Sequence, residues 1–581
     1  MAAVTAEASA AERFQVALGL SPVFARLLAA RGWREISALT EFLYPRLEHT
    51  HSPWLMLGME AAVTRILAAI AAGEPIRILG DYDADGTLAT VILRQALQSL
   101  GAQVSYQLPQ RLGGGYGLSL AMIEQARAAG VGLVITVDTG IRELEPLARA
   151  RELGLDVIVT DHHLPGPDLP VALAILNPHQ PDCRYPDKGL CGSGVAFKLV
   201  HALLERGGKL EQPWPPALRS YLKLLGIATV ADAMPLLGEN RVLVRFGLQG
   251  LTEPVNPGLR ALLQLAMAGR PNATAPTARD AAFRLAPRLN AAGRMGRAEQ
   301  VVELFFSPPA AAAEAAQALE ALNTQRRQVC DQIQAACEAQ LELATALPPG
   351  VLVLAGEGWH RGVLGIVASR VMERTGRPVL MLSLEDGWAY GSGRAPTGWH
   401  LLEQLDACRD LFLRYGGHAQ AVGCTLAADR LTELRRRLQA EPPGPPYAPL
   451  PDTFAIALPE ITPAFARDLL RLEPCGEANP DPQFLARGVR LATPPQRLKD
   501  AHAKLVLEQD GVRHTALFWN LWRNGEYQHA PLRPLWNELV PGLRLDARFR
   551  VVLDAHPQYG ERLQLILNDF FVTPAAAATS H

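Results

Sequence analysis

Short apolar runs and helical patterns alternate along the chain from about residue 54 onwards. The runs are rich in β-branched residues, as in buried strands, and lie near 76–80, 103–108, 132–137, 156–160 and 171–176. Between them, apolar residues recur every three or four positions, as on the buried face of a helix. Strands that alternate with helices predict a doubly wound parallel sheet. Such sheets bind ligands outside the carboxyl ends of their strands, so the residues after each run are of interest.

The same pattern divides the chain into segments of different character. The expected segments are, in order, a helical lead-in (1–53), an α/β domain (54–307), a connector helix (308–345), a second, smaller α/β domain (346–440), a Pro-rich linker (441–451), a β-barrel (452–573) and a tail (574–581). The fold class is therefore α/β, followed by a barrel of the oligonucleotide-binding (OB) kind. The barrel is predicted from five strand-like runs and from Asp510-Gly511, a typical hairpin turn.

We expect this barrel to carry a basic and aromatic face suited to single-stranded nucleic acid. Its members would be Arg487, Arg490, Lys504, Arg513, Arg548 and Arg550, with Phe518 and Trp519. The alternative is an ordinary barrel with solvated arginines.

Composition and charge exclude several classes of protein. The 581-residue chain has 49% apolar and 20% charged residues, and no apolar run reaches the roughly 18 residues of a membrane span. Glu7 and Glu12 near the N-terminus, without a basic region, argue against a signal peptide. Seven cysteines without a CxxC motif indicate a reducing, cytoplasmic compartment. Because the net charge is −2, any nucleic-acid partner would need a local basic groove.

Carboxylates and imidazoles gather where the apolar segments of the first α/β domain end. Eight residues do so: Asp81, Asp83, Asp85, Asp138, Asp161, His162, His163 and Asp232. We expect most of them to meet at one edge of the sheet. Like charges this close repel and raise one another's pKa, which a divalent cation would relieve. The alternatives are a solvated acidic turn and a helix-capping histidine pair, but the combination favours one or two divalent ions.

Two Gly-rich segments of the second α/β domain, 390–394 and 415–419, are candidates for phosphate contact. Glycine allows a close backbone approach, and Ser392 and Arg394 supply hydrogen-bond donors. Each segment alone is a weak signal, since Gly-rich turns are common.

With these motifs assembled, the chain resembles the DHH phosphoesterase superfamily, and within it the bacterial single-strand-specific 5′→3′ exonucleases. The resemblance extends from about residue 50 to 570. It rests on segments at 80–86, 137–141, 160–163, 191–196, 230–232, 287–294, 358–365, 391–394 and 416–420. It implies a DHH domain, a DHHA1 module over 346–440 and a barrel that grips single-stranded DNA. The DNA strand would thread between the two α/β domains.

The resemblance also implies the metal and its ligands. The family uses Mn²⁺ or Mg²⁺, and we expect two ions. The matching ligands are Asp83, Asp85, Asp138, His162 and Asp232. His163 would face the scissile phosphate, and Asp161 would orient a histidine from behind. Two ions together would activate water and neutralise the phosphate.

Two positions depart from the family pattern. Leu79 stands where some relatives carry a histidine ligand, so one ion would have fewer protein ligands. Cys475 stands near the barrel, where relatives usually carry an aromatic residue. Whether Asp81 binds metal directly or only shapes its loop is left open.

A 5′→3′ exonuclease needs a pocket for the terminal 5′-phosphate. The candidates are Arg111, Arg288, Ser392 and Arg394, because arginine forks suit a dianionic phosphate. Asn290, Arg294, His360 and His418 complete the set expected to bind DNA. The alternative for the arginines is a structural or surface role.

The function predicted is therefore metal-dependent 5′→3′ hydrolysis of single-stranded DNA, in repair and recombination. A phosphodiesterase of short oligonucleotides or cyclic dinucleotides, the first alternative, would have no need of the barrel. A non-catalytic replication scaffold, the second, would have no need of an intact ligand set. The family suggests a single-strand-binding protein and a helicase as partners, and we expect a monomer.

Overall fold

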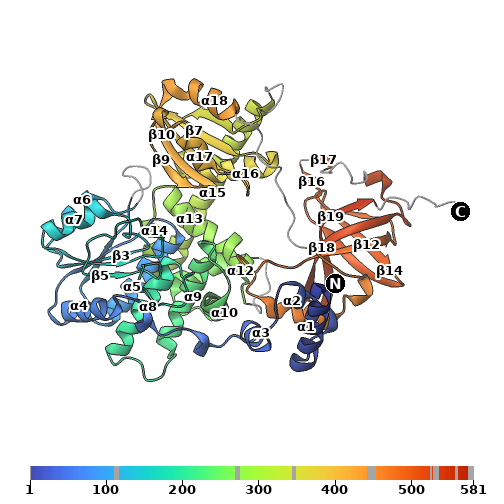
Figure 1. Cartoon of the computed structure of the whole chain (residues 1–581), viewed down its shortest axis with the longest axis horizontal. Coiled ribbons are helices and arrows are strands. Elements are labelled where there is room, and N and C mark those ends of the chain that lie inside the picture. The colour runs from blue at the N-terminus through green and yellow to red at the C-terminus, as the bar shows by residue number, and fades with distance from the viewer. Residues whose placement is uncertain are drawn as a thin grey trace. The chain divides into compact units, whose positions relative to one another are not determined.

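A computed structural model shows the fold of the chain (Figure 1). It describes residues 2–109, 117–268, 275–342, 348–440, 453–523, 526–527, 536–556 and 560–572. The predicted linker at 441–451 and the predicted tail at 574–581 lie outside these residues. The chain forms two compact units. The α/β unit comprises Thr50–Met234 and Leu243–Pro449, and the barrel unit comprises Met1–His49, Pro235–Val242 and Leu450–His581.

The α/β unit contains the predicted parallel sheet, with five strands in the order β2-β1-β3-β4-β5. The strands are β1 (Ile76–Leu79), β2 (Val104–Gln107), β3 (Leu133–Val137), β4 (Asp156–Thr160) and β5 (Ala174–Leu176). All five lie within the apolar runs of the sequence, so the prediction is confirmed. Since β1, β3 and β4 are neighbours and parallel, the residues that follow them meet at one edge.

Helices cover both faces of this sheet (Figure 1). On one face lie α6 (Leu120–Ala128) and α7 (Leu144–Glu152), which pack through Ile123 and Leu147 onto Val134 and Val159. On the other lie α4 (Met59–Ala71), α5 (Ala84–Ser99) and α8 (Gly192–Arg206). The helices that follow are α9 (Pro216–Ala231), α10 (Gly238–Gly250), α11 (Pro257–Ala266), α12 (Ala278–Asp280), α13 (Ala286–Arg294) and α14 (Glu299–Phe306).

One long helix, α15 (Pro309–Glu342), leads to a second sheet in the order β6-β7-β8-β10-β9. Its strands are β6 (Leu352–Glu357), β7 (Val379–Glu385), β8 (Trp388–Arg394), β9 (Phe412–His418) and β10 (Ala421–Ala427). The remaining helices here are α16 (Leu364–Thr375), α17 (Leu401–Asp406) and α18 (Leu431–Ala440). Along its length, α15 packs against α11, α13, α14 and α16.

The two Gly-rich segments, proposed for phosphate contact, lie almost entirely in strands. They lie in β8 and β9, and both strands pair with β10. Packing explains the glycines of β8, because a Cβ on Gly391 would lie 2.4 Å from the Cys424 sulfur, and one on Gly393 would lie 2.6 Å from Val422.

The barrel unit contains a seven-stranded sheet in the order β11-β12-β18-β19-β15-β14-β13, which a further pairing of β12 with β14 closes. Its strands are β11 (Thr453–Ala455), β12 (Gln483–Leu491), β13 (Gln496–Leu498), β14 (His502–Gln509), β15 (Val512–Phe518), β18 (Arg544–His556) and β19 (Gly560–Val572). Two short strands, β16 (Trp522–Arg523) and β17 (Glu526–Tyr527), pair separately. The turn between β14 and β15 has Asp510 and Gly511 at φ +51° and +80°, as the hairpin signal predicts.

The N-terminal helices share the core of the barrel. These are α1 (Ala2–Leu18), α2 (Pro22–Ala30) and α3 (Ile36–Leu43). Phe14 and Phe24 are buried in one cluster with Phe465 of α19 (Pro463–Leu469) and with Phe484 and Phe549 of the barrel strands. The predicted lead-in is thus part of the barrel unit, although sequence pattern alone does not connect the two.

A single buried arginine, Arg241, holds this unit together. Its guanidinium donates hydrogen bonds to five carbonyl groups, those of Phe42, Arg471, Leu472, Glu473 and Pro474. It also stacks 3.8 Å over the ring of Phe42. One side chain therefore joins the end of α3 to the loop that precedes β12.

The basic face predicted on the barrel is found only in part. Arg490 and Arg513 both pair with Glu508, Arg548 pairs with Asp569, and Arg550 pairs with Asp481. Phe518 points into the core, whereas Trp519 is 49% exposed. Cross-strand carboxylates neutralise most of the arginines, which the sequence pattern of single strands does not reveal.

Among the described residues, no single helix is long and apolar enough to span a membrane, and one bent pair, Leu47–Leu55 with Met59–Ala71, passes that test only when the two are combined.

Candidate metal centre

The loop after β1 places three carboxylates at the start of α5. Asp83 is the N-cap of this helix, and its Oδ1 accepts a hydrogen bond from the Gly86 N–H at 3.0 Å. A Cβ on Gly86 would lie 2.7 Å from the Asp81 Cβ, so only glycine allows the tight turn. From α13, Asn290 Oδ1 accepts a hydrogen bond from the Ala84 N–H at 2.8 Å.

The third carboxylate of this loop, Asp85, lies at the N-terminus of α8. Its two oxygens accept hydrogen bonds from the N–H groups of Gly192 and Ser193, at 2.7 and 2.9 Å. The partial positive charge of a helix N-terminus stabilises such a carboxylate. Gly192 also lies against Asp138, because a Cβ at this position would be 2.5 Å from Asp138 Oδ1.

His162, which follows β4, is the point where the other ligand candidates converge. Its Nε2 lies 3.1 Å from Asp138 Oδ1, 3.5 Å from Asp232 Oδ2 and 4.0 Å from Asp85 Oδ2. Asp138 adopts a left-handed backbone conformation with φ +63° directly after β3. Asp232 is the C-cap residue of α9, so its carboxylate comes from outside the sheet. Residues far apart in sequence thus meet at the predicted strand edge.

Three overlapping groups of these side chains have ligand atoms within 4.8 Å of one another. The groups are Asp81 with Asp83 and Asp138, Asp85 with His162 and Asp232, and Asp138 with His162 and His163. All five ligands expected from the sequence belong to them, and Asp81 does as well. Leu79 is fully buried in the apolar cluster beneath α6 and α7, so it leaves the centre without a side-chain ligand from β1.

The electrostatics of the centre fit a divalent cation. Burial, together with the charges of Asp85 and Asp83, raises the pKa of Asp138 well above its ordinary value. Burial and the charges of Asp85 and Asp83 also raise the pKa of Asp232 to about 8. Burial lowers the pKa of His162, which favours the neutral imidazole that a metal requires. A bound cation would let these carboxylates ionise, so the donor set suits Mn²⁺ or Mg²⁺.

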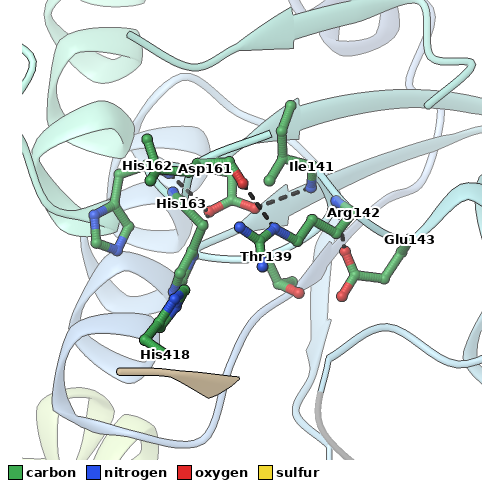
Figure 2. Close-up of a pocket in the computed structure, with 9 residues that line it drawn as sticks. Thr139, Ile141, Arg142, Glu143, Asp161, His162, His163 and His418 are labelled. Atoms are coloured by element: carbon green, nitrogen blue, oxygen red, sulfur yellow. Dashed lines mark hydrogen bonds and ion pairs between the residues drawn. The ribbon is translucent and has the colours of Figure 1, made fainter. Parts of the chain in front are cut away.

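Asp161 and His163 form a second pair beside this cluster (Figure 2). Asp161 Oδ1 lies 2.7 Å from His163 Nδ1, and Asp161 Oδ2 accepts a hydrogen bond from the Ile141 N–H at 2.9 Å. Burial alone would lower the pKa of His163, but the hydrogen bond and charge of Asp161 raise it to about 9. Burial would raise the pKa of Asp161, and its interactions with His163 more than offset this, so its pKa is lowered. The geometry fits the orienting role expected for Asp161.

Both α/β domains line a pocket of about 280 Å³ beside this pair (Figure 2). His162, His163 and Asp161 line it from the first sheet, and His418 lines it from β9 of the second. Its other lining residues are Thr139, Ile141, Arg142, Glu143 and Leu164. Sequence reasoning did not single out Arg142 or Glu143. Their signal was their position, because they continue the segment that follows the apolar run at 133–137.

Of the expected DNA-binding residues, Arg288 and Asn290 make structural contacts. Arg288 pairs with Glu320 of α15, with Nε 2.5 Å from Oε2. Asn290 holds the loop of Ala84, as described above. Arg111 lies outside the described residues. That the four residues form one 5′-phosphate site therefore stays a prediction.

The remaining candidates lie where the two α/β domains approach each other. Arg294 donates a hydrogen bond to the Gly362 carbonyl at 3.2 Å, and His360 Nδ1 accepts one from the Gly362 N–H at 3.2 Å. Arg394 Nη1 lies 3.3 Å from Ser392 Oγ. This pair is packed so tightly against α16 that a Cβ on Gly365 would lie 2.7 Å from Arg394 Nη2.

Comparison with curated proteins gives relatives that match most of the chain. The single-stranded-DNA-specific exonuclease RecJ of Dickeya dadantii (strain 3937) is 39% identical over 521 residues, which are 85% of this chain and 88% of that protein. The chain belongs to the RecJ family. The Bacillus subtilis (strain 168) RecJ, of the same description, is 36% identical over 537 residues. These are 91% of this chain and 65% of that protein, so the chain spans slightly less than two thirds of that relative.

Three family models match the chain in the expected order. They are the DHH family N-terminal domain over 75–229, the DHHA1 domain over 349–441 and the RecJ OB domain over 454–567. The predicted fold class and family are therefore confirmed.

Solved RecJ structures resemble the whole chain and contain metal. The crystal structure of RecJ from Thermus thermophilus in complex with Mn²⁺ has a TM-score of 0.79 and 31% identity, and covers 98% of this chain and 78% of that one. The corresponding complex with Mg²⁺ has a TM-score of 0.72 and 29% identity, and covers 98% and 77%. The expected cofactors are those that these RecJ structures contain.

Proposed function

We propose that this protein is a metal-dependent exonuclease that degrades single-stranded DNA from its 5′ end. The observation that carries the proposal is the convergence of Asp138, Asp232 and Asp85 on His162, at 3.1–4.0 Å. Family membership supplies the substrate class, since the RecJ relatives are described as single-stranded-DNA-specific exonucleases. Release of nucleotides from the 5′ end is the part of the proposal that rests on the family resemblance alone.

The protein's own residues divide into a ligand set and a phosphate-facing histidine. Asp81, Asp83, Asp85, Asp138, His162 and Asp232 would hold the ions. Bound Mn²⁺ or Mg²⁺ would supply Lewis acidity for the phosphate and an activated water. With Nδ1 beside Asp161, His163 would donate a hydrogen bond from Nε2 to a phosphate oxygen. Its raised pKa keeps this ring cationic near neutral pH, which suits an anionic substrate.

The barrel and the ligand set each argue against one of the two alternatives expected from the sequence. A phosphodiesterase of short oligonucleotides or cyclic dinucleotides needs no RecJ OB domain, which this chain has over 454–567. A non-catalytic scaffold needs no ligand set, whereas here each expected ligand belongs to at least one of the three groups that could hold a metal ion.

Partners and compartment follow from the same proposal. A single-strand exonuclease acts on DNA that has been unwound, so we propose that a helicase supplies its substrate and that it meets strands covered by a single-strand-binding protein. We propose that it acts as a monomer in the cytoplasm. All seven cysteines are free thiols, in keeping with a reducing compartment.

The test uses single strands labelled at the 5′ or 3′ end, with and without Mn²⁺. Label should be released first from the 5′ end and only with metal. Asp138→Ala should abolish turnover while single-strand affinity persists in a gel shift, because the strand is gripped mainly elsewhere. Earlier release of the 3′ label would refute the polarity, and full activity of Asp138→Ala would refute the metal centre.

A further inference from the structure

The long helix α15 carries an arginine, Arg326, that has no carboxylate partner among the described residues. Its neighbours differ from it in this respect. Arg327 pairs with Glu320 at 3.1 Å, and Arg288 pairs with the same carboxylate at 2.5 Å. A partly buried positive charge is costly unless something negative compensates it. Arg326 therefore has the electrostatic character of a binding residue.

The guanidinium of Arg326 has unused hydrogen-bonding capacity. Its Nη2 donates to Asn323 Oδ1 at 2.8 Å, whereas its Nε is buried and has no hydrogen-bond partner in the described part of the chain. Burial, with the positive charges of Arg370 and Arg327 nearby, lowers its pKa. Desolvation and positive neighbours both favour an anion at this position.

Arg326 lines a pocket of about 230 Å³ formed by α9, α13, α15 and α16, with Ala282 from the turn before α13. The polar lining consists of Arg326, Arg294 and Asn290, and no carboxylate belongs to it. The Oδ1 of Asn290 already accepts the Ala84 N–H, so its amide N–H groups are what it offers to a ligand. The other lining residues are apolar: Val230, Ala231, Ala282, Ala286, Pro287 and Ile366. Two cations and an amide donor in an apolar wall fit an anion.

The pocket adjoins the metal centre from two sides. Ala231, in its wall, immediately precedes Asp232, and Asn290 holds Ala84 between Asp83 and Asp85. An anion in this pocket would thus lie beside the loops that carry the metal ligands. A DNA strand whose scissile phosphate is at the metal centre carries further phosphates on its neighbouring nucleotides.

We propose that this pocket binds a second phosphate group of the DNA strand and that Arg326 is its principal cationic contact. The inference rests on the proposed function, and it adds a substrate-binding residue from the helix that the sequence pattern marked only as a connector. The phosphate has two possible sources, an internal diester or the terminal 5′-phosphate.

Single-strand affinity measured at several salt concentrations tests this proposal. All variants carry Asp138→Ala, so that the DNA is not hydrolysed. Oligothymidylates with a 5′-phosphate or a 5′-hydroxyl, labelled at the 3′ end, are titrated and followed by fluorescence anisotropy. Arg326→Gln removes the charge, Arg326→Lys keeps it, and Arg327→Gln is the matched control on the adjacent, carboxylate-paired residue.

Arg326→Gln should weaken binding roughly 10- to 150-fold, the loss expected for a charge-assisted hydrogen bond. It should also reduce the slope of log affinity against log salt by about 0.7, the value for one phosphate of a single strand. Arg326→Lys should keep the slope. Arg327→Gln should have the same affinity and slope as the reference protein, which carries Asp138→Ala alone. An equal loss of affinity for the 5′-phosphate and 5′-hydroxyl oligothymidylates supports contact with an internal phosphate. A loss confined to the 5′-phosphorylated oligothymidylate supports contact with the terminal phosphate.

The proposal would be overturned if Arg326→Gln had the same affinity and slope as the reference protein. It would also be overturned if the affinity fell while the slope stayed unchanged, because that would indicate altered packing of α15. If Arg326→Gln does not fold, the test is chemical modification of arginines by phenylglyoxal in the reference protein, which carries Asp138→Ala alone. Mass spectrometry then measures the modification of Arg326, and bound DNA should reduce it. Absence of protection would overturn the proposal. Failure of the reference protein to bind any single strand would instead refute the proposed function.

Discussion

Replacing Asp161 with Asn should change the pH dependence of turnover more than its maximum. Asp161 lies 2.7 Å from His163 Nδ1 and, against the effect of burial, raises the pKa of that histidine to about 9. Without the charge, the pKa of His163 should return to its ordinary value of about 6.5 or below. Because folding raises the pKa of His163, the interaction between Asp161 and the cationic ring is fully present below about pH 6.5. It is lost as the pH rises through about 9.

The size of the effect follows from the two pKa values. At pH 8, a group with a pKa of about 9 is roughly 90% protonated, whereas one with a pKa of about 6.5 is roughly 3% protonated. If the cationic ring is needed for turnover, Asp161→Asn should lose roughly 30-fold in kcat at pH 8 and less than about 2-fold at pH 6. Asp232 and Asp81 also raise the pKa of His163, and metal ions bound to them would cancel that effect. The pKa of His163 would then be lower than about 9, so a loss of about 30-fold is an upper value.

The assay is single-turnover hydrolysis of a 5′-phosphorylated oligothymidylate between pH 6 and 9 at a saturating Mg²⁺ concentration. Asp156→Asn is a suitable control, because Asp156 begins the same strand and its carboxylate pairs with Arg65 instead. A loss of the same factor at every pH would show that Asp161 positions the ring without setting its protonation, and the reasoning would fail.

Three further changes test other parts of the structure. Gly192→Ala places a methyl group 2.5 Å from Asp138 Oδ1 and should weaken Mn²⁺ binding about 10- to 100-fold by calorimetry; unchanged affinity would separate Gly192 from the ligand set. Arg394→Ala should lower kcat/KM roughly 10- to 150-fold on 5′-phosphorylated strands and much less on 5′-hydroxyl strands, and equal losses would make Arg394 a general strand contact. Arg241→Met leaves five buried carbonyl groups without their donor and should destabilise the barrel unit by at least about 3 kcal/mol, measured as a lower urea midpoint; a wild-type midpoint would contradict this.

The strand edge of the metal centre was predictable because its signals are local. Asp138 directly follows an apolar run, and Asp83 and His162 lie a few residues after the ends of two others; the alternation of strands and helices implies that these runs are parallel neighbours. The periodicity of single segments contains that information. Asp232, which comes from a helix, was assigned to the same site because it also lies where an apolar segment ends.

The contacts that hold the ligands were not predictable, because they join distant segments. Asp85 is held by Gly192 across 107 residues, and Asn290 holds Ala84 across 206 residues. Arg288 is similar, since it pairs with Glu320 of α15. In each case the partner lies on an element whose own pattern indicates only a helix.

The shared core of the N-terminal helices and the barrel has a consequence for synthesis. The Ser21 N–H donates to Asp468 across 447 residues, and Phe14 and Phe24 pack with Phe549. During translation, α1 to α3 are made first but their apolar faces stay uncovered until the last strands leave the ribosome. Closing so long a loop is also slow, since local contacts form first. The emerging chain would therefore expose the apolar faces of these helices until the barrel strands that cover them have been made.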